Sequence, residues 1–496
     1  MTEDDLRGHA FTLSPEEFRK LGYAAVDLAA NYLKDLPTRP VFQPVPGEER
    51  VALMGQSLSE DGIPPDHLLR FVEEHILPWP MGNGNPRFFA WVNSPPAMLA
   101  AIMDLLASTM NPSCAGGDHA AVYLERCAVR WLMELTQYPV EGSMGLLVSG
   151  GSAASLTCLT VARHWAAKQM GWNVRTHGLQ AGHPDLVLYL SEEGHSCMRK
   201  AAELLGLGGR SVRLIPVDDH FRMDRHALRD AIQHDRSLGS MPFCVGASAG
   251  TVNTGAIDPL DDLAELCAEE NLWLHVDGAY GGFGILDPAR SQHYHGMERA
   301  QSVAIDPHKW LSVPLECGCA IVRDGSLMRD AFSLMPEYLH QTGSSAGLPW
   351  YSEYGFQQSR GFRALKLWAV LAGGGRRGLS RNISQHNLLA QALSRLVDHE
   401  ASLERLAPVT LSIVCFRYRP DNLPQDTKSS EQELNRLNQV LLETLQSEGR
   451  VFLSGTTLRG RFALRACILN YATTYDDIEF LVKTVVETGK RVSHGT

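Results

Sequence analysis

Short apolar runs alternate with stretches of helical periodicity through the middle of the chain, from about residue 96 to residue 385. Continuous apolar strands that are separated by helices are typical of a parallel sheet covered on both faces. The pattern therefore predicts an α/β fold, with a mostly parallel central sheet flanked by helices. The expected strands are residues 145–148, 185–189, 213–216, 242–247, 272–276, 302–305 and 319–322.

An amphipathic helix is predicted near the N-terminus. Ser14-Pro15-Glu16-Glu17 has the sequence of a capping box with proline at the first helical position, and the helix should run to about residue 36. Four prolines between residues 37 and 46 then favour an extended segment. A helix followed by such an arm packs poorly on itself, so we expect it to lie across another subunit or the main body. Its apolar face consists of Phe18, Leu21, Ala25, Leu28 and Tyr32.

These patterns divide the chain into three parts. Residues 1–95 form an N-terminal helical segment, residues 96–385 a large α/β domain, and residues 386–496 a small C-terminal domain. In the last part we expect a helix, a strand at 411–418 and a final helix at 475–488. No internal repeat or low-complexity segment interrupts this organisation.

Composition narrows the class of protein. A chain of 496 residues with 44% hydrophobic and 20% charged residues is able to bury a large core, as soluble globular proteins do. A net charge of −11 argues against a nucleic-acid partner. The N-terminus is acidic and has no signal-like apolar segment, and the apolar region at 97–107 is too short to span a bilayer. We therefore expect no membrane partner and a cytoplasmic location.

The cysteines favour the same compartment. Ten cysteines without regular spacing are typical of reduced, mostly buried thiols. Cys317-Gly318-Cys319 lacks a matching pair of histidines or cysteines elsewhere, so no metal site is expected.

Candidate chemistry follows the ends of the predicted strands, where ligands bind in sheets of this type. Asp277 ends an apolar strand, and a carboxylate in such a place needs a cation, such as a protonated pyridine nitrogen. Lys309 follows another apolar run with His308 beside it, and its amine could bind an aldehyde as a Schiff base. Taken singly, a helix cap and a solvated surface charge are ordinary interpretations of these two residues.

Three further strand ends add to this set. The turn from Ser149 to Ser155 contains Gly151 and Ser152 and precedes a helical stretch at 156–169, so its free amides could bind phosphate. His195 could stack on an aromatic ring, or could be an ordinary loop histidine. Thr251 ends a turn of small residues that could approach a ligand closely, or that only connects two elements.

Together these features predict one cofactor. A phosphate site, a stacking ring, a carboxylate for a pyridinium and an aldehyde-binding lysine are the groups that pyridoxal 5′-phosphate (PLP) needs. Walker and dinucleotide-binding glycine patterns are absent, which disfavours a dinucleotide-dependent oxidoreductase. A PLP-dependent transaminase would share the cofactor residues, but would normally carry an arginine for the substrate carboxylate in its C-terminal domain.

At these positions the sequence resembles the group II PLP-dependent amino-acid decarboxylases, which include enzymes for aromatic amino acids, glutamate and diaminobutyrate. The similarity extends over nearly the whole chain. The motifs are Asn85-Pro86-Arg87-Phe88-Phe89-Ala90, Asn111-Pro112-Ser113, Ser149 to Ser155, Gly194-His195-Ser196, His275-Val276-Asp277-Gly278-Ala279-Tyr280, Asp306-Pro307-His308-Lys309-Trp310 and Gly361-Phe362-Arg363-Ala364-Leu365-Lys366-Leu367-Trp368.

The resemblance implies PLP fold type I, the aspartate-aminotransferase-like fold, in a homodimer whose N-terminal helices wrap around the partner. Lys309 would then form the Schiff base with PLP, and Asp277 would keep the pyridine nitrogen protonated. Ala279 would press on one face of the ring while His195 stacks on the other.

The same resemblance implies a phosphate site at Gly151 and Ser152, helped by Asp306 or His308. The family often has asparagine at the position of Asp306, and an aspartate repels a phosphate, so this residue could instead orient His308.

The resemblance also assigns a mobile loop at 335–339. Tyr338 lies at the position of the family's catalytic tyrosine, which protonates the carbon left after carbon dioxide departs. Relatives with phenylalanine there form aldehydes by oxidative deamination, so a tyrosine favours simple decarboxylation.

For the substrate, an amino acid, we expect an aromatic side chain first. Trp91, Asn93 and Ser359 lie where the family forms its side-chain pocket. Trp91 and Asn93 differ from the residues common in aromatic decarboxylases, and a buried amide favours a substrate that can bond to it. A polar substrate of the diaminobutyrate or glutamate type, an aldehyde synthase, and a non-catalytic homologue that binds PLP therefore remain alternatives.

Overall fold

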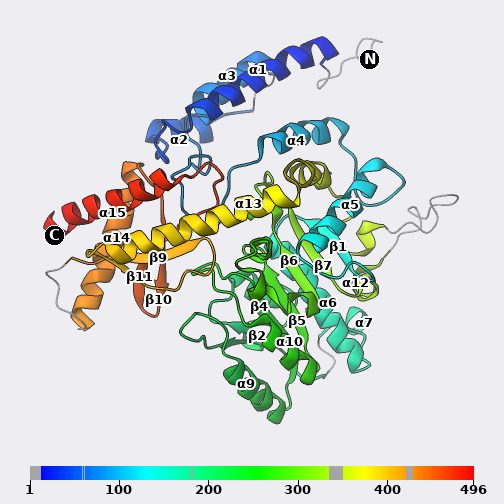
Figure 1. The fold of residues 1–496 in the computed structure, drawn as a ribbon. Coiled ribbons are helices and arrows are strands. Elements are labelled where there is room, and N and C mark those ends of the chain that lie inside the picture. Colours follow the sequence, from blue (N-terminus) through cyan, green and yellow to red (C-terminus); the bar gives the residue numbers. More distant parts are fainter. Residues whose placement is uncertain are drawn as a thin grey trace, which may run out of the picture.

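A seven-stranded sheet forms the centre of the protein (Figure 1). The computed structural model describes residues 13–58, 60, 62–179, 182–334, 350–420 and 428–495. All seven predicted strands form, and they lie in the order β1-β7-β6-β5-β4-β2-β3. Their bounds are β1 Met144–Val148, β2 Leu186–Ser191, β3 Val212–Ile215, β4 Met241–Ser248, β5 Trp273–Gly278, β6 Ser302–Ile305 and β7 Gly318–Val322.

Strand direction follows the prediction of a mostly parallel sheet. β2, β3, β4, β5 and β6 pair in parallel, whereas β7 is antiparallel to both β6 and β1. The chain turns back after β6 through the short helix α11 (Pro307–Trp310), which reverses the direction of the next strand. Because these five strands are parallel, the segments that follow them emerge at one edge of the sheet.

Helices cover both faces of the sheet. α6 (Gly151–Gln169) packs on β4, β5, β6 and β7, and its buried face is made largely of small residues such as Ala154, Cys158 and Ala162. The predicted helix began at residue 156, but α6 starts at Gly151, because the glycine-serine turn is itself the first helical turn. The other helices of this part are α5 Ala120–Leu135, α7 Val174–His177, α8 Ser196–Leu204, α9 Arg225–Ser237, α10 Leu260–Glu269 and α12 Gly325–Phe332.

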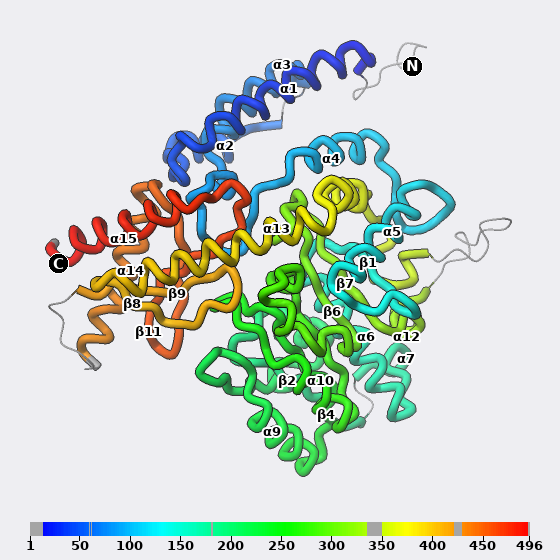
Figure 2. The backbone as a smooth tube through the Cα atoms, viewed as in Figure 1, coloured from blue at the N-terminus to red at the C-terminus, as the bar shows by residue number. Residues whose placement is uncertain are grey.

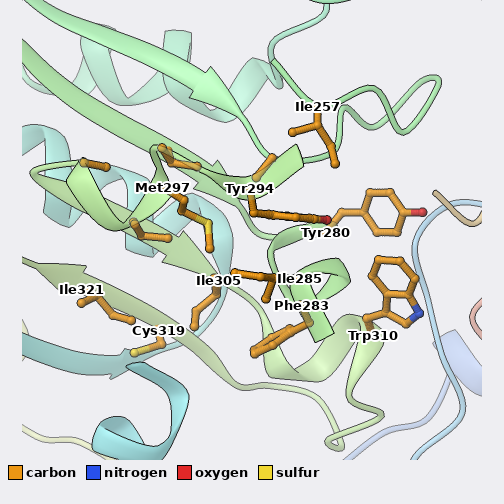
Figure 3. Close-up of a cluster of buried hydrophobic side chains, with 14 of the residues drawn as sticks. Ile257, Tyr280, Phe283, Ile285, Tyr294, Met297, Ile305, Trp310, Cys319 and Ile321 are labelled. Atoms are coloured by element: carbon orange, nitrogen blue, oxygen red, sulfur yellow. The ribbon is translucent and has the colours of Figure 1, made fainter. Parts of the chain in front are cut away.

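The opposite face of the sheet buries a cluster of large side chains (Figure 3). Ile305 and Ile321 project from β6 and β7 into this cluster. Tyr280 and Trp310 stack at its edge, with ring centroids 5.2 Å apart. This contact joins the segment after Asp277 to the segment that carries Lys309. Short 3₁₀ turns complete this region at Gly209–Ser211, Gly282–Leu286, Ser291–Tyr294, Met297–Arg299 and Tyr351–Glu353.

A long helix leads into the C-terminal part. α13 (Arg363–His399) has one non-helical residue, Gly375 with φ 59°, and connects the large sheet with the smaller one (Figures 1 and 2). The predicted domain boundary at 385/386 falls inside the helical part of α13 that follows Gly375.

The small sheet is antiparallel, with the order β10-β11-β9-β8. β9 (Ile413–Tyr418) and the final helix were predicted, whereas β8 (Leu403–Arg405), β10 (Ser454–Leu458) and β11 (Arg461–Cys467) were missed. Helices α14 (Lys428–Glu448) and α15 (Tyr475–Gly495) complete this part.

The N-terminal helices lie apart from the sheets (Figure 2). α1 (Pro15–Asp35) begins at the predicted capping box, in which the Ser14 hydroxyl accepts from the Glu17 amide and the Glu17 carboxylate accepts from the Ser14 amide. α2 (Gly47–Met54), α3 (Pro65–Phe71) and a π-helical turn at Val72–Ile76 follow. None of these helices has a buried residue, and α4 (Met98–Met110) buries two alanines.

Candidate active site

The segments after the strands enclose a cavity of about 780 Å³. Residues that follow the strands of the large sheet form one wall, and residues 91–93 and the C-terminal part complete it. The cavity brings together nine residues predicted to bind a cofactor, namely Gly151, Ser152, His195, Thr251, Asp277, Ala279, Asp306, His308 and Lys309.

Lys309 and Asp306 form an ion pair at this site. Asp306 directly follows β6, so the one-turn helix α11 brings Lys309 back over it, with Nζ 3.0 Å from Asp306 Oδ2. Burial acts to lower the pKa of Lys309, but the carboxylates of Asp306 and Asp277 outweigh this effect and raise it. The amine is therefore held as an ammonium until a ligand changes its surroundings.

His308 lies near the same carboxylate oxygen. Its Nε2 lies 3.6 Å from Asp306 Oδ2, while its Nδ1 accepts a hydrogen bond of 3.1 Å from the Cys317 amide. That bond leaves the ring proton on Nε2, facing Asp306, when the ring is neutral. Burial lowers the pKa of His308, which favours the neutral ring.

The start of α6 forms a cradle that only glycine permits. A Cβ on Gly151 would lie 2.8 Å from Ala279 Cβ and 2.9 Å from Asp306 Oδ2. No side chain caps the helix, so its first amides are free to bind a ligand together with the positive end of the helix dipole. The Ser152 side chain is exposed at this point and lines the cavity.

Asp277 and His195 line the cavity from β5 and from the start of α8. Asp277 Oδ1 accepts a 3.1 Å hydrogen bond from the Ala279 amide, which fixes the carboxylate against the turn. His195 caps α8, with Nδ1 accepting from the Cys197 amide at 3.2 Å. Burial, reinforced by the charges of Lys309 and Lys200, lowers the pKa of His195 although Asp277 and Asp306 oppose it.

These groups fit a phosphorylated pyridine aldehyde. The glycine cradle with free helix amides suits a phosphate, Asp277 suits a pyridinium nitrogen, and Lys309 suits an aldehyde. Among the described residues, no cluster of three or more histidine, cysteine, aspartate or glutamate side chains could hold a metal ion.

Comparison with known proteins decides the family. The pyridoxal-dependent decarboxylase conserved domain matches residues 46–419. The chain belongs to this decarboxylase family. PLP is accordingly its cofactor, and it is an amino-acid decarboxylase, as the motif resemblance implied. A second family, described as the PDXDC1-like second central domain, matches residues 396–495 of the decarboxylase.

Relatives of the decarboxylase match along nearly its whole length. An aromatic-L-amino-acid decarboxylase of Bacillus atrophaeus is 33% identical over 484 residues, which covers 97% of each chain. Tyrosine decarboxylase 4 of Petroselinum crispum is 32% identical and covers 92% of this chain and 90% of its own. The crystal structure of Oryza sativa TDC with PLP and tryptamine superposes with a TM-score of 0.90 at 27% identity, over 97% of this chain and 99% of that one.

Of the three residues predicted to bind the substrate, two line the cavity and one does not. Trp91 and Asn93 line the cavity, and Trp91 has φ 52° and keeps 47% of its surface exposed. Ser359 is exposed and is not among the residues that line this cavity. Tyr338 lies outside the residues that the structure describes. Thr251 lines the cavity but its hydroxyl bonds within its own turn, to Thr254 Oγ1 at 3.0 Å.

The sequence patterns did not predict Arg465, a cation that lines the cavity from the C-terminal part. It projects from β11 with 3% of its surface exposed and bonds the carbonyls of Val252 at 2.8 Å and Trp91 at 2.8 Å. Its Nη2 is buried and has no hydrogen-bond partner in the described part of the chain. Arg465, which stands between apolar residues of 462–467, was the available signal, because a buried guanidinium needs several acceptors.

Proposed function

We propose that this PLP-dependent decarboxylase converts an aromatic L-amino acid into the corresponding amine and carbon dioxide. The observation that carries the choice of substrate is Trp91, whose half-exposed indole lines the cavity. It packs in an aromatic group with Phe88 and Phe452, at centroid distances of 5.8 and 5.7 Å. An aromatic side chain gains offset or edge-to-face contacts on such a wall. The names of the two relatives above support the same choice.

Bound PLP supplies an electron sink for the bond between Cα and the carboxylate of the substrate. Lys309 would hold the cofactor through its side-chain amine, and the substrate amine would take its place. Asp277 stabilises a proton on the pyridine nitrogen, and an aligned charge of this kind is a large contribution to catalysis. His195 and Ala279 would hold the ring of the cofactor between them. The amides of Gly151 and Ser152 would hold its phosphate.

After carbon dioxide leaves, a proton must reach the former Cα. We assign this step to Tyr338, on the strength of the loop motif in the sequence. A closing loop would also exclude water during the step.

A polar or acidic substrate is the second candidate. The unpartnered Nη2 of Arg465 and the amide of Asn93 on the same cavity favour it. A second carboxylate on the substrate would pair with Arg465, and a buried, charge-assisted contact of that kind is strong.

We also propose that the decarboxylase is a homodimer. Helices α1 to α4 expose large apolar side chains that a single chain leaves in water, and exposed apolar patches are typical of subunit interfaces. The most exposed of these are Tyr23, Val26, Val51, Met54, Ile102 and Met110. A mass of about twice 54.6 kDa in light scattering is expected, and a monomer at micromolar concentration would contradict the proposal.

A cytoplasmic location agrees with the thiols. All ten cysteines are free and nine of them are buried, which is usual for proteins of reducing compartments. Among the described residues, no helix is long and apolar enough to cross a membrane.

The substrate is tested by supplying the holoenzyme with a panel of L-amino acids and measuring carbon dioxide and amine. We expect kcat/KM to be highest for tyrosine, tryptophan or dihydroxyphenylalanine, and to vanish in Lys309→Ala. Highest turnover with glutamate or diaminobutyrate would move the assignment to the polar class. Cofactor binding without release of carbon dioxide from any amino acid would indicate a non-catalytic homologue.

A further inference from the structure

Asp306 is a buried carboxylate beside the start of α6. It is 1% exposed, and its Oδ1 has no hydrogen-bond partner in the described part of the chain. Its Oδ2 lies 3.0 Å from Lys309 Nζ and would lie 2.9 Å from a Cβ on Gly151. On the other side, a Cβ on Gly318 would come within 2.7 Å of Oδ1. The carboxylate is therefore enclosed between two glycines, next to the helix terminus assigned to the phosphate.

The cavity has no positive charge to spare for a phosphate. Three carboxylates and two cations line it, but Glu316 is paired with Arg363 outside the lining, so the remaining charges balance when the histidines are neutral. A phosphate monoester adds nearly two more at neutral pH. The pyridinium nitrogen returns only one positive charge. The charged lining residues are Asp277, Asp306, Glu316, Lys309 and Arg465.

Titratable groups around Asp306 do not supply the missing charge. His308 and His195 have pKa values lowered by burial, so both favour the neutral ring. Burial raises the pKa values of the Cys197 and Cys317 thiols to about 12, so both stay protonated. Lys309 is the single cation paired with Asp306 in the described residues, and the start of α6 contributes only backbone amides and the Ser152 hydroxyl.

We propose that the decarboxylase takes up one proton when it binds the phosphate of its cofactor, and that Asp306 and the phosphate hold this proton between them. The inference rests on the proposed phosphate site at Gly151 and Ser152. A carboxylate and a phosphate in contact raise each other's proton affinity, as two adjacent acids do. With the proton in place, one oxygen donates and the other accepts, so repulsion is replaced by a hydrogen bond.

An asparagine at position 306 would behave differently. Its amide donates to the phosphate without a change in protonation, so cofactor binding would not draw a proton to this site. Asp306 therefore makes cofactor affinity sensitive to pH: affinity falls as the pH rises, by up to about tenfold per pH unit for one linked proton.

Calorimetric titration with pyridoxamine 5′-phosphate tests the proposal. This probe lacks the aldehyde, so Lys309 keeps its proton throughout. Binding heats in two buffers of different ionisation enthalpy, neither of them phosphate, give the number of protons taken up. We expect the wild type to take up close to one proton more than Asp306→Asn or Asp306→Ser. The matched control Glu316→Gln removes a half-exposed carboxylate of the same cavity, and it should resemble the wild type.

Uptake of a proton at the pyridine nitrogen is common to all these proteins, since each retains Asp277. Equal uptake by the wild type and a folded Asp306 variant would overturn the proposal. If neither variant folds, pyridoxamine decides with the wild type alone: it has the same ring without a phosphate, and the extra proton should be missing. The same uptake with both probes would refute the inference. Failure of the wild type to bind the phosphorylated probe would instead refute the proposed cofactor site.

Discussion

Replacing Gly151 by alanine tests the phosphate cradle directly. The new Cβ would lie 2.8 Å from Ala279 Cβ and 2.9 Å from Asp306 Oδ2, both closer than van der Waals contact allows. Ala279 has no side-chain torsion with which to move away. Asp306 is paired with Lys309 at 3.0 Å and is confined on its other side by Gly318. The backbone at the start of α6 must therefore withdraw.

This withdrawal should weaken cofactor binding more than folding. The first turn of α6 has no side-chain cap to lose, so its displacement costs little in the cofactor-free protein. To bind the phosphate, the amides must return to the overpacked position, and overpacking of this kind costs about 1–3 kcal/mol. Because the relaxed cofactor-free protein does not bear this cost, it corresponds to an increase of roughly 5- to 150-fold in the Kd for PLP.

The assay is a titration of cofactor-free protein with PLP, followed by absorbance, together with thermal melting of the cofactor-free form. Gly378→Ala is the matched control, because nothing lies within 4 Å of a Cβ at this position in α13. A Kd for Gly151→Ala within about twofold of the wild-type value would show that the phosphate does not bind at this helix terminus, and would refute the reasoning.

Three further predictions concern other parts of the molecule. Glu125→Gln should lower the free energy of unfolding, measured in urea, by about 3–5 kcal/mol, because Arg360 then remains fully buried without its counter-charge. Asp330→Asn, which breaks the surface pair with Lys168, should lower it by less than about 1 kcal/mol. Equal losses in the two variants would contradict this contrast. Tyr338→Phe should lose amine product and gain aldehyde by mass spectrometry, and unchanged amine output would remove this tyrosine from the mechanism. The raised pKa of Lys309 predicts that the rate of PLP attachment increases as the pH rises toward that pKa, because only the neutral amine attacks the aldehyde. A rate that does not depend on pH in stopped-flow absorbance would contradict this prediction.

The large domain could be predicted from the sequence because its strands are buried on both faces. Each strand is then a continuous apolar run, and the residues after it must lie at one edge of the sheet. From that rule alone, Asp277, His195 and Lys309 were predicted to lie at a common site. The reversal of β7 could not be predicted, because an apolar run does not encode the direction of a strand.

The C-terminal part was harder to predict. Strand β11 contains Arg461 and Arg465 among apolar residues, so its sequence does not read as a buried run. Arg465 was missed as a cavity residue for the same reason, since only the pairing of β11 with β9 and β10 directs it toward Trp91 and Val252. Contacts of this kind join segments several hundred residues apart, and local sequence patterns do not specify them.

The central claim is that Lys309 holds PLP in this cavity. Reduction of the holoenzyme with borohydride, followed by peptide mass spectrometry, tests it most directly. The account predicts a phosphopyridoxyl group on Lys309 and its loss in Lys309→Ala. The same group on a different lysine of the wild-type chain, or on none, would contradict the account.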